Sequence, residues 1–429
     1  MFLEKEGKLI YSYDGETVCI EAWGKDALRV RATKNRSFTG RDWALEAKDA
    51  HAGEVEIFED PSAKGGAFAN MYEGTDTSYG KITNGKLHAV IDSGSVITFY
   101  HEDGRVLLKE HFRRLRDEES MPLNIMGREY SNGVGDNFRI VARFVARKGE
   151  KIFGMGQYQQ HELDLKGCML ELAQRNSQVS VPFYLSSIGY GFLWNNPGVG
   201  QVMFANNGTE WVTESGKEID YLVIAGDTPA EIEENYMTLT GKPPMMPEYG
   251  MGFWQCKLRY WNQEQLLSVA RKYKELGVPL DVIVVDFFHW TKQGEFKFDP
   301  KYWPDVPGMC RELKEMGIQV VVSVWPTVDI YSENFEEMKE KGYLVRTEHG
   351  VPLTMLCGGN EVFFDATNPD ARTYVWEKIK KNYYDQGAKL FWLDVAEPEY
   401  SVYDFKNYRY QLGSVQEVGN ISVSYTHLT

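Results

Sequence analysis

Short apolar runs separated by turn residues fill the first half of the chain. In the segment KLHAVID (86–92), Leu87, Ala89 and Ile91 occupy every second position and therefore fall on one side of an extended strand. Asp103-Gly104 separates two further apolar runs, and this dipeptide is a strong hairpin signal because Gly tolerates the positive φ of tight turns. Similar runs recur to about residue 225, which predicts an antiparallel β-sandwich over residues 1–226.

A capped helix and a proline-rich linker follow this predicted domain. Thr228, Pro229 and Glu231 have the hydroxyl, first-turn proline and reciprocal carboxylate of a helix start. The helix is expected to stop near Gly241, and three prolines follow it within six residues. Residues 227–249 are therefore predicted to be a capping helix and a stiff linker.

From Gly250 onward, buried strands alternate with amphipathic helices. Helix starts are expected at Asn262 and Asn368, and the first helix places an apolar face along its length as far as Leu276. Strands are expected at residues 251–256, 281–286, 319–325 and 390–394. The core of 281–286 (DVIVVD) is an unbroken apolar run, typical of a strand covered on both faces. This alternation predicts parallel βα units. A doubly wound sheet has the same local pattern but usually carries a Gly-rich phosphate loop, and none is present, so residues 250–421 are predicted to be a partial (β/α)8 barrel.

Two carboxylates end buried strands of this predicted barrel. Asp286 and Asp394 occupy equivalent strand ends, where a carboxylate is costly unless it has partners or a function. For one such Asp, a helix cap or an ion pair would be the better interpretation. Because Trp290, Trp325 and Trp392 lie nearby in sequence, a sugar site is favoured, since aromatic faces stack on pyranose rings while carboxylates bind hydroxyls. Each Trp alone is also explained by core packing, and an outward-facing Trp392 stays an alternative.

Composition and charge exclude several function classes. At 429 residues the length suggests two or three domains, and an apolar fraction of 43% suffices for sizeable cores. The formal charge of −15 argues against nucleic acid as a partner, and no run approaches the roughly 20 apolar residues needed to span a bilayer. The charged start MFLEKEGKLI lacks the features of a signal peptide, so a cytoplasmic location is expected.

Other catalytic signals are weak. Five widely spaced cysteines read as isolated thiols, and the eight histidines form no cluster with metal-ligand spacing. There is no G-x-S-x-G elbow, and Gly154-Met155-Gly156 is interpreted as a tight turn. No cofactor and no metal site are predicted. A homo-oligomer is left open.

Several segments together resemble glycoside hydrolase family 31. The resemblance rests on KLFWLDVAEPEY (389–400), GFWQCKLRYW (252–261), VVDFFHW (284–290), FDPKYWPDVPGM (298–309), SVWP (323–326) and GMGQYQQ (154–160). It implies a mutarotase-like β-sandwich ahead of a (β/α)8 barrel, in agreement with the residue patterns.

The resemblance also implies roles for individual residues. Asp394 would be the nucleophile, with Glu397 supporting its loop, and Asp286 would hydrogen-bond the sugar. Trp325 would form a wall of the same subsite. The remaining substrate-binding candidates are Phe287, Phe288, Trp254 and Gln157, the last on a loop that reaches toward the active site in this family.

The implied activity is retaining α-glycoside hydrolysis on an oligosaccharide or a small α-glycoside. One carboxylate attacks the anomeric carbon and another protonates the leaving oxygen. In the family the acid is an Asp on a later barrel strand, and only four of eight strands are expected here. Residues 422–429 (SVSYTHLT) depart from the family pattern and are interpreted as a non-native tail. The expectation is a truncated chain that lacks the general acid, aggregates readily and is inactive alone.

Xylose is the predicted sugar. Phe287 and Phe288 would fill the space that a glucose hydroxymethyl group requires, as similar aromatic pairs do in the family's α-xylosidases. Trp392 departs from the Lys that some of these α-xylosidases carry two positions before the nucleophile. An α-glucosidase, transglycosylase or glucan lyase on the same scaffold, or a non-catalytic sugar-binding protein, are the alternatives.

Overall fold

The computed structural model describes residues 1–46, 49–61, 77–115, 123–176, 178–351, 360–397 and 405–421. These divide into two compact units, one formed by residues 1–173 and 177–243 and the other by residues 174–176 and 244–429. Cys357 and the predicted tail at 422–429 lie outside the described residues.

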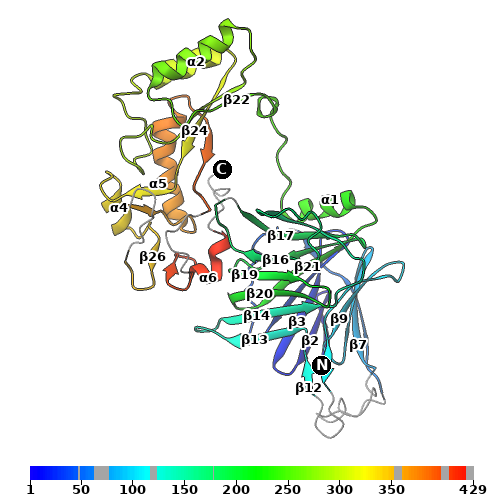
Figure 1. Cartoon of the computed structure of the whole chain (residues 1–429). Coiled ribbons are helices and arrows are strands. Elements are labelled where there is room, and N and C mark those ends of the chain that lie inside the picture. The colour runs from blue at the N-terminus through cyan, green and yellow to red at the C-terminus, as the bar shows by residue number, and fades with distance from the viewer. Residues whose placement is uncertain are drawn as a thin grey trace. The chain divides into compact units, whose positions relative to one another are not determined.

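The N-terminal unit is built almost entirely from antiparallel strands (Figure 1). In chain order they are β1 (Phe2–Lys5), β2 (Lys8–Tyr13), β3 (Glu16–Trp23), β4 (Ala27–Thr33), β5 (Ala50–His51), β6 (Glu54–Phe58), β7 (Tyr79–Asn84), β8 (Leu87–Asp92), β9 (Ile97–His101), β10 (Val106–Lys109), β11 (Arg113–Leu115), β12 (Leu123–Ile125), β13 (Arg128–Asn132), β14 (Phe138–Phe144), β15 (Ile152–Gln157), β16 (Met169–Leu172), β17 (Val179–Ser186), β18 (Tyr190–Trp194), β19 (Gly200–Phe204), β20 (Thr209–Gly216) and β21 (Ile219–Ala225). The predicted strand at KLHAVID buries Leu87, Ala89 and Ile91, and the hairpin predicted at Asp103-Gly104 joins β9 to β10.

Three sheets form the sandwich. The largest runs β1-β2-β3-β4-β21-β18-β17-β15, with β5 paired to β3, and the two five-stranded sheets run β10-β9-β8-β7-β6 and β13-β14-β20-β19-β16. Aromatic contacts join them: Tyr221 of the largest sheet meets Phe99 and Phe144 edge-on, at 6.2 and 5.4 Å between ring centroids. Phe192 stacks on Trp211 at 5.2 Å. The predicted β-sandwich is therefore confirmed, and its core lies between these sheets.

A buried ion-pair cluster lies within this core. The Arg128 guanidinium donates to both carboxylate oxygens of Glu16, at 2.9 and 3.0 Å, and also to Glu110. All three side chains are buried. Ser95 supplies two further acceptors to the same guanidinium, at 2.7 and 2.9 Å. Because a buried charge is tolerated only when it is paired and hydrogen-bonded, these residues depend on one another.

Helix α1 (Pro229–Thr240) closes the N-terminal unit as the sequence predicted. The Thr228 hydroxyl accepts from the backbone N–H of Glu231, and the helix ends at Gly241. Ile232 and Leu239 are buried against Phe183, Leu222 and neighbouring apolar residues of the largest sheet.

The second unit alternates parallel strands with helices. Its elements are η2 (Glu248–Met251), β22 (Trp254–Gln255), α2 (Gln263–Glu275), β23 (Val282–Val285), α3 (Val306–Glu315), β24 (Gln319–Val324), β25 (Thr327–Asp329), α4 (Phe335–Glu340), β26 (Arg346–Thr347), β27 (Glu361–Phe363), α5 (Pro369–Ile379), the π-helical η3 (Lys380–Tyr384), β28 (Leu390–Leu393), β29 (Tyr408–Arg409), α6 (Val415–Val418) and η4 (Gly419–Ile421). The expected caps are present, since Asn262 and Asn368 each accept a backbone N–H in the first turn of their helix.

Four parallel strands form the sheet of this unit, in the order β22-β23-β24-β28. They are the expected first half of a (β/α)8 barrel, which needs eight strands to close. One face carries Ile283, Val285, Val322 and Val324, and packs against apolar side chains of α2, α3 and α5. The opposite face, which would line a barrel interior, carries a smaller cluster that includes Val282, Val284 and Val321.

Two sequence-based predictions needed correction in this unit. The strand expected at residues 251–256 is reduced to β22, because a 3-10 turn occupies Glu248–Met251 and β22 has a single partner at the edge of the sheet. Leu276 does not join the buried face of α2. It is 61% exposed, because it is the C-cap residue at which the helix ends.

Candidate active site

The carboxyl ends of the parallel strands bring Asp286 and Asp394 to one rim of the sheet. Val285 is level with Val322 across β23 and β24, and Leu393 is level with Val324 across β24 and β28. Asp286 and Asp394 come directly after Val285 and Leu393. In a βα barrel this rim holds the active site.

The alternation of side chains along the strands also gives these residues the same face. Val282 and Val284 lie on the face opposite the helices, and the next residue of that series on the strand is Asp286. Every second residue of a strand points to the same face, so Trp325 shares the face of Val321, and Trp392 and Asp394 share the face of Leu390. The opposite face of the sheet packs against helices α2, α3 and α5.

The side chain of Asp394 is held by an indole. The Nε1–H of Trp325 donates to Asp394 Oδ2 at 3.1 Å, and the Asp394 backbone N–H donates to Val324 O at 3.2 Å. Asp394 itself is half-buried, whereas Trp325 is only 8% exposed. Val395, directly after it, has φ of 60°, which is an outlier for a β-branched residue and indicates a strained turn at this point. One carboxylate oxygen is thereby fixed while the residue stays partly open to solvent.

Both oxygens of Asp286 have a donor as well. The backbone N–H of Phe287 donates to Oδ1 at 2.8 Å, and the Cys256 thiol donates to Oδ2 at 3.5 Å. Cys256 is an exposed residue, but partial desolvation of its thiol, together with the negative charge of Asp286, raises the pKa of the thiol to about 11, so it is protonated at neutral pH and can donate. These two contacts fix the orientation of the Asp286 carboxylate.

Aromatic rings form a wall beside the two carboxylates. Phe287 stacks on Trp325 with 5.1 Å between centroids and 28° between planes, and Phe288 lies 4.5 Å from Phe287. Trp290 meets Trp325 edge-on at 6.0 Å. Phe288 is 50% exposed and has φ of 61°, again an outlier for a bulky residue. The combination of an apolar wall with a few fixed polar groups is typical of small-ligand sites.

A buried histidine supports the turn that carries Asp286. His289 Nδ1 lies 3.0 Å from Asp286 O and its Nε2 lies 2.9 Å from the Tyr383 hydroxyl, so a neutral ring with Nδ1 protonated satisfies both contacts. Burial lowers the pKa of His289 to about 4, which keeps the ring neutral near pH 7. The residue therefore ties the strand end to the helix segment η3.

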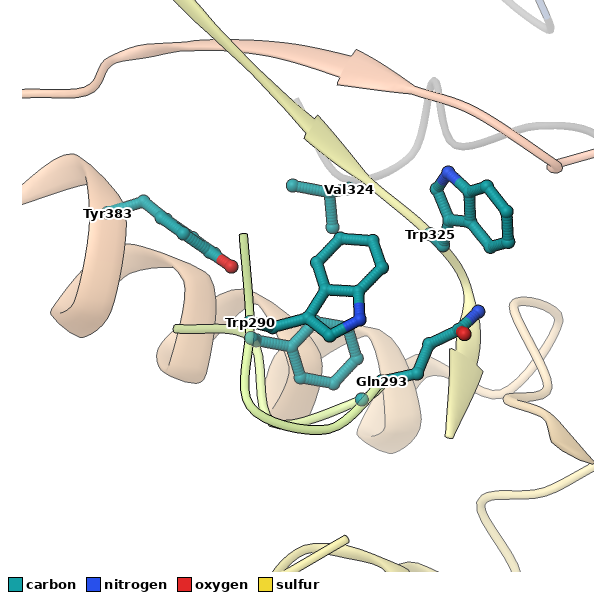
Figure 2. A pocket seen from close by; sticks show the side chains of 7 residues that line it. Trp290, Gln293, Val324, Trp325 and Tyr383 are labelled. Carbon is teal, nitrogen blue, oxygen red and sulfur yellow. The ribbon is translucent and has the colours of Figure 1, made fainter. Parts of the chain in front are cut away.

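A small cavity lies behind the aromatic wall (Figure 2). Its lining is Trp290, Gln293, Gly294, Phe296, Val324, Trp325 and Tyr383. With about 10 Å³ open to the centre of a water molecule, it has room for about one water and not for a sugar ring.

The structure brings together most, but not all, of the residues that the sequence singled out. Asp394, Asp286, Phe287, Phe288 and Trp325 form one group. Trp254 points to the same face of the sheet as Asp286, but it is level with Val282, which lies four residues before Asp286. Its Nε1–H donates to Gly250 O at 3.3 Å. The structure does not bring it to the group.

The remaining candidates are placed as follows. Trp392 is 48% exposed and lies two residues before Asp394 on β28, and both its contact with a sugar and the outward-facing alternative stay predictions. Glu397 is half-buried, and its Oε2 is shielded from solvent without a hydrogen-bond partner among the described residues. Gln157 ends β15 in the N-terminal unit, and its contact with a sugar stays a prediction.

Sequence reasoning missed three residues that contact this group: Cys256, His289 and Arg259, whose guanidinium carbon lies 5.2 Å from the Phe288 ring centroid. A thiol two residues along the face from Trp254 was a usable signal for Cys256, because alternation aims it at the level next to Asp286. His289 and Arg259 act through contacts between separate strands and loops, and single-residue patterns do not contain these.

Comparison with known proteins identifies the family to which the chain belongs. The family model "Glycosyl hydrolases family 31 TIM-barrel domain" matches residues 243–427. The chain is 45% identical over 429 residues to a protein of Pseudescherichia vulneris named "Uncharacterized family 31 glucosidase ORF2", covering 97% of this chain and 78% of that one. The chain belongs to glycoside hydrolase family 31.

Two further relatives carry the name of xylosidases. Alpha-xylosidase A of Aspergillus niger is 31% identical, over 89% of this chain and 52% of that protein. The crystal structure of a GH31 alpha-xylosidase from a soil metagenome, complexed with xylose, is 50% identical with a TM-score of 0.90, over 99% of this chain and 61% of that chain. This family 31 chain therefore spans between about half and four-fifths of the length of these relatives. Among its described helices, none combines the length and apolar character that crossing a bilayer requires.

Proposed function

We propose that this family 31 chain carries the nucleophile side of a retaining α-xylosidase, with Asp394 as the nucleophile. The observation that supports this best is the 3.1 Å hydrogen bond from Trp325 Nε1 to Asp394 Oδ2, at the strand-end rim that also carries Asp286. A nucleophilic carboxylate must be ionised and aimed, and a single N–H donor on one oxygen leaves the other free to attack.

The reaction proceeds in two displacements. Asp394 forms a bond to the anomeric carbon as the bond to the leaving oxygen breaks, and a general acid gives that oxygen a proton. Water then cleaves the glycosyl–Asp394 ester, and the same acid residue, now acting as a base, takes the proton of the water. Asp286 accepts hydrogen bonds from sugar hydroxyls, Trp325 and Phe287 bound the ring, and Glu397 supports the loop after the nucleophile.

The general acid is proposed to lie on a barrel strand beyond the four described here, as the family resemblance implies. A retaining acid stands roughly 5–5.5 Å from the nucleophile, and its loss typically lowers the rate by about 10²–10⁴. The 429-residue chain by itself is therefore expected to turn over ordinary glycosides very slowly. It is expected to react with glycosyl fluorides, since fluoride departs without needing a protonated carboxyl group.

Xylose is proposed as the glycone in preference to glucose. Phe287 and Phe288 follow Asp286 directly, and Phe287 is stacked on Trp325 at 5.1 Å, so the aromatic pair occupies the space next to the sugar-binding carboxylate. Two of the relatives named above are xylosidases. A steric difference of about one methylene is worth about 1–3 kcal/mol, which corresponds to a preference of roughly 10–200-fold.

The test is fluoride release by the 429-residue chain from α-xylosyl fluoride and from α-glucosyl fluoride. We expect faster release from the xyloside, and Asp394→Asn should abolish release from both. Faster release from the glucoside would contradict the choice of sugar and favour an α-glucosidase, as the name of the Pseudescherichia vulneris relative implies for that protein. Equal binding of xylose by the unmutated chain and by Asp394→Asn, with no fluoride released, would indicate a sugar-binding protein instead.

A further inference from the structure

The Arg259 cation lies close to two aromatic rings, one of which, Phe288, belongs to the aromatic wall described above. The guanidinium carbon of Arg259 lies 3.9 Å from the ring centroid of Trp261 and 5.2 Å from that of Phe288. Both distances are within the roughly 6 Å over which a cation is attracted to a ring face. Arg259 is half-buried and belongs to the loop after β22, whereas Phe288 belongs to the loop after β23.

These two rings are the contacts that hold the Arg259 side chain. Within the described part of the chain, no carboxylate pairs with its guanidinium and no side-chain hydrogen bond involves it. An arginine held by ring faces alone is well suited to fix a ring in place, because its planar group stacks on the ring without needing an anion.

Phe288 needs such a support. Its backbone has φ of 61°, a conformation that bulky residues rarely adopt, and its side chain is 50% exposed. An exposed ring on a strained backbone would otherwise sample several rotamers, and it would then exclude a hydroxymethyl group poorly. Its ring contacts are Phe287 at 4.5 Å and Trp290, edge-on, at 6.3 Å, and the Arg259 cation is the charged group over its face.

The geometry points to Arg259 as a positioning residue that sets sugar specificity by holding the Phe288 ring against the place of a hexose C6 group. This inference rests on the proposed function, in which Phe287 and Phe288 select xylose. Arg259 touches neither the sugar nor Asp394 in this scheme, and it acts through Phe288 alone.

The experiment is a double-mutant cycle in which the measured quantity is the ratio of the affinities for D-xylose and D-glucose. D-xylose and D-glucose are titrated by NMR into the 429-residue chain and into Arg259→Ala, Phe288→Ala and the double variant. We expect Arg259→Ala to lower the preference for xylose at least about threefold, a part of the roughly 10–200-fold range available to such a pocket. In the Phe288→Ala background, Arg259→Ala should change the ratio no further.

Two controls separate this role from a general loss of charge or fold. Lys257→Ala removes a neighbouring cation of the same loop and should leave the ratio unchanged. Arg259→Lys keeps a cation over the rings and should restore part of the preference. If Phe288→Ala changes the ratio while Arg259→Ala does not, the inference is overturned.

The inference can fail or stand separately from the proposed function. If the unmutated chain binds glucose as tightly as xylose, or binds neither sugar, the proposed function fails. The same four proteins are therefore also compared by thermal unfolding. Losses in Tm that do not add in the double variant support the contact between Arg259 and Phe288, and additive losses refute it.

Discussion

Replacing Trp325 by Phe isolates the hydrogen bond that aims the nucleophile. The substitution removes the indole Nε1–H that donates to Asp394 at 3.1 Å, and it keeps an aromatic ring to stack on Phe287. Since Trp325 is 8% exposed, the bond is largely shielded from water.

The size of the effect follows from the charge on the acceptor. A hydrogen bond to a charged group contributes about 1.5–3 kcal/mol. If that energy is lost from the transition state of the first displacement, and each 1.36 kcal/mol is a factor of ten, the rate falls by about 10–150-fold. The affinity for xylose should change much less, because the ring wall is preserved.

The assay is the first-turnover rate of fluoride release from α-xylosyl fluoride. The matched control is Trp290→Phe, since Trp290 belongs to the same wall, 6.0 Å from Trp325, and none of its hydrogen bonds in the described structure reaches Asp394. We expect a large loss of rate in the Trp325 variant and a small one in the Trp290 variant. Equal losses in both would show that packing of the wall, and not the donor, controls the rate, and the reasoning would be refuted.

Three further outcomes are expected from contacts elsewhere in the chain. The pKa of His289 is about 4 in the folded chain against 6.5 in the unfolded one, so unfolded molecules bind a proton that folded molecules do not. Stability should fall by about 3 kcal/mol as the pH drops from 6.5 to 4, and urea titrations of His289→Gln should lack this part of the decline. Arg128→Met should lower the unfolding free energy by about 3–5 kcal/mol, because it leaves two buried carboxylates without their cation. The control Arg139→Met, at an exposed ion pair, should lower it by at most about 1 kcal/mol, and similar losses in the two variants would contradict this. Cys256→Ala should weaken xylose binding about threefold to tenfold and Cys256→Ser should not, and equal weakening would show that the thiol does not act as a donor to Asp286.

The sequence predicted three of the four parallel strands, β23, β24 and β28, and their ends closely, because both follow from local patterns. The strands before Asp286 and Asp394 are continuous apolar runs, and a carboxylate directly after such a run is visible without coordinates. β23 is buried as expected, whereas no residue of β28 is buried, because β28 ends the described four-stranded sheet. The caps at Thr228, Asn262 and Asn368 were equally local. Alternation then gave a common face without any knowledge of the neighbouring strand.

The contacts that tune the site depend on pairs distant in sequence. Cys256 meets Asp286 across 30 positions, and His289 meets Tyr383 across 94, so neither pairing is encoded in a periodicity. Trp254 was placed at the site because it lies in a family-like segment. The register of β22 sets it four residues lower along the sheet, and register is decided by strand pairing.

The identity of the nucleophile can be measured directly by trapping the covalent intermediate on the 429-residue chain. With α-xylosyl fluoride, the chain should release a burst of about one fluoride per molecule, because the second displacement needs the acid–base residue that the proposal places on a later strand. Proteolysis and mass spectrometry of the denatured product should then find one xylosyl group on the peptide that contains Asp394. A xylosyl group on another residue, or fluoride released with no labelled peptide, would contradict the account.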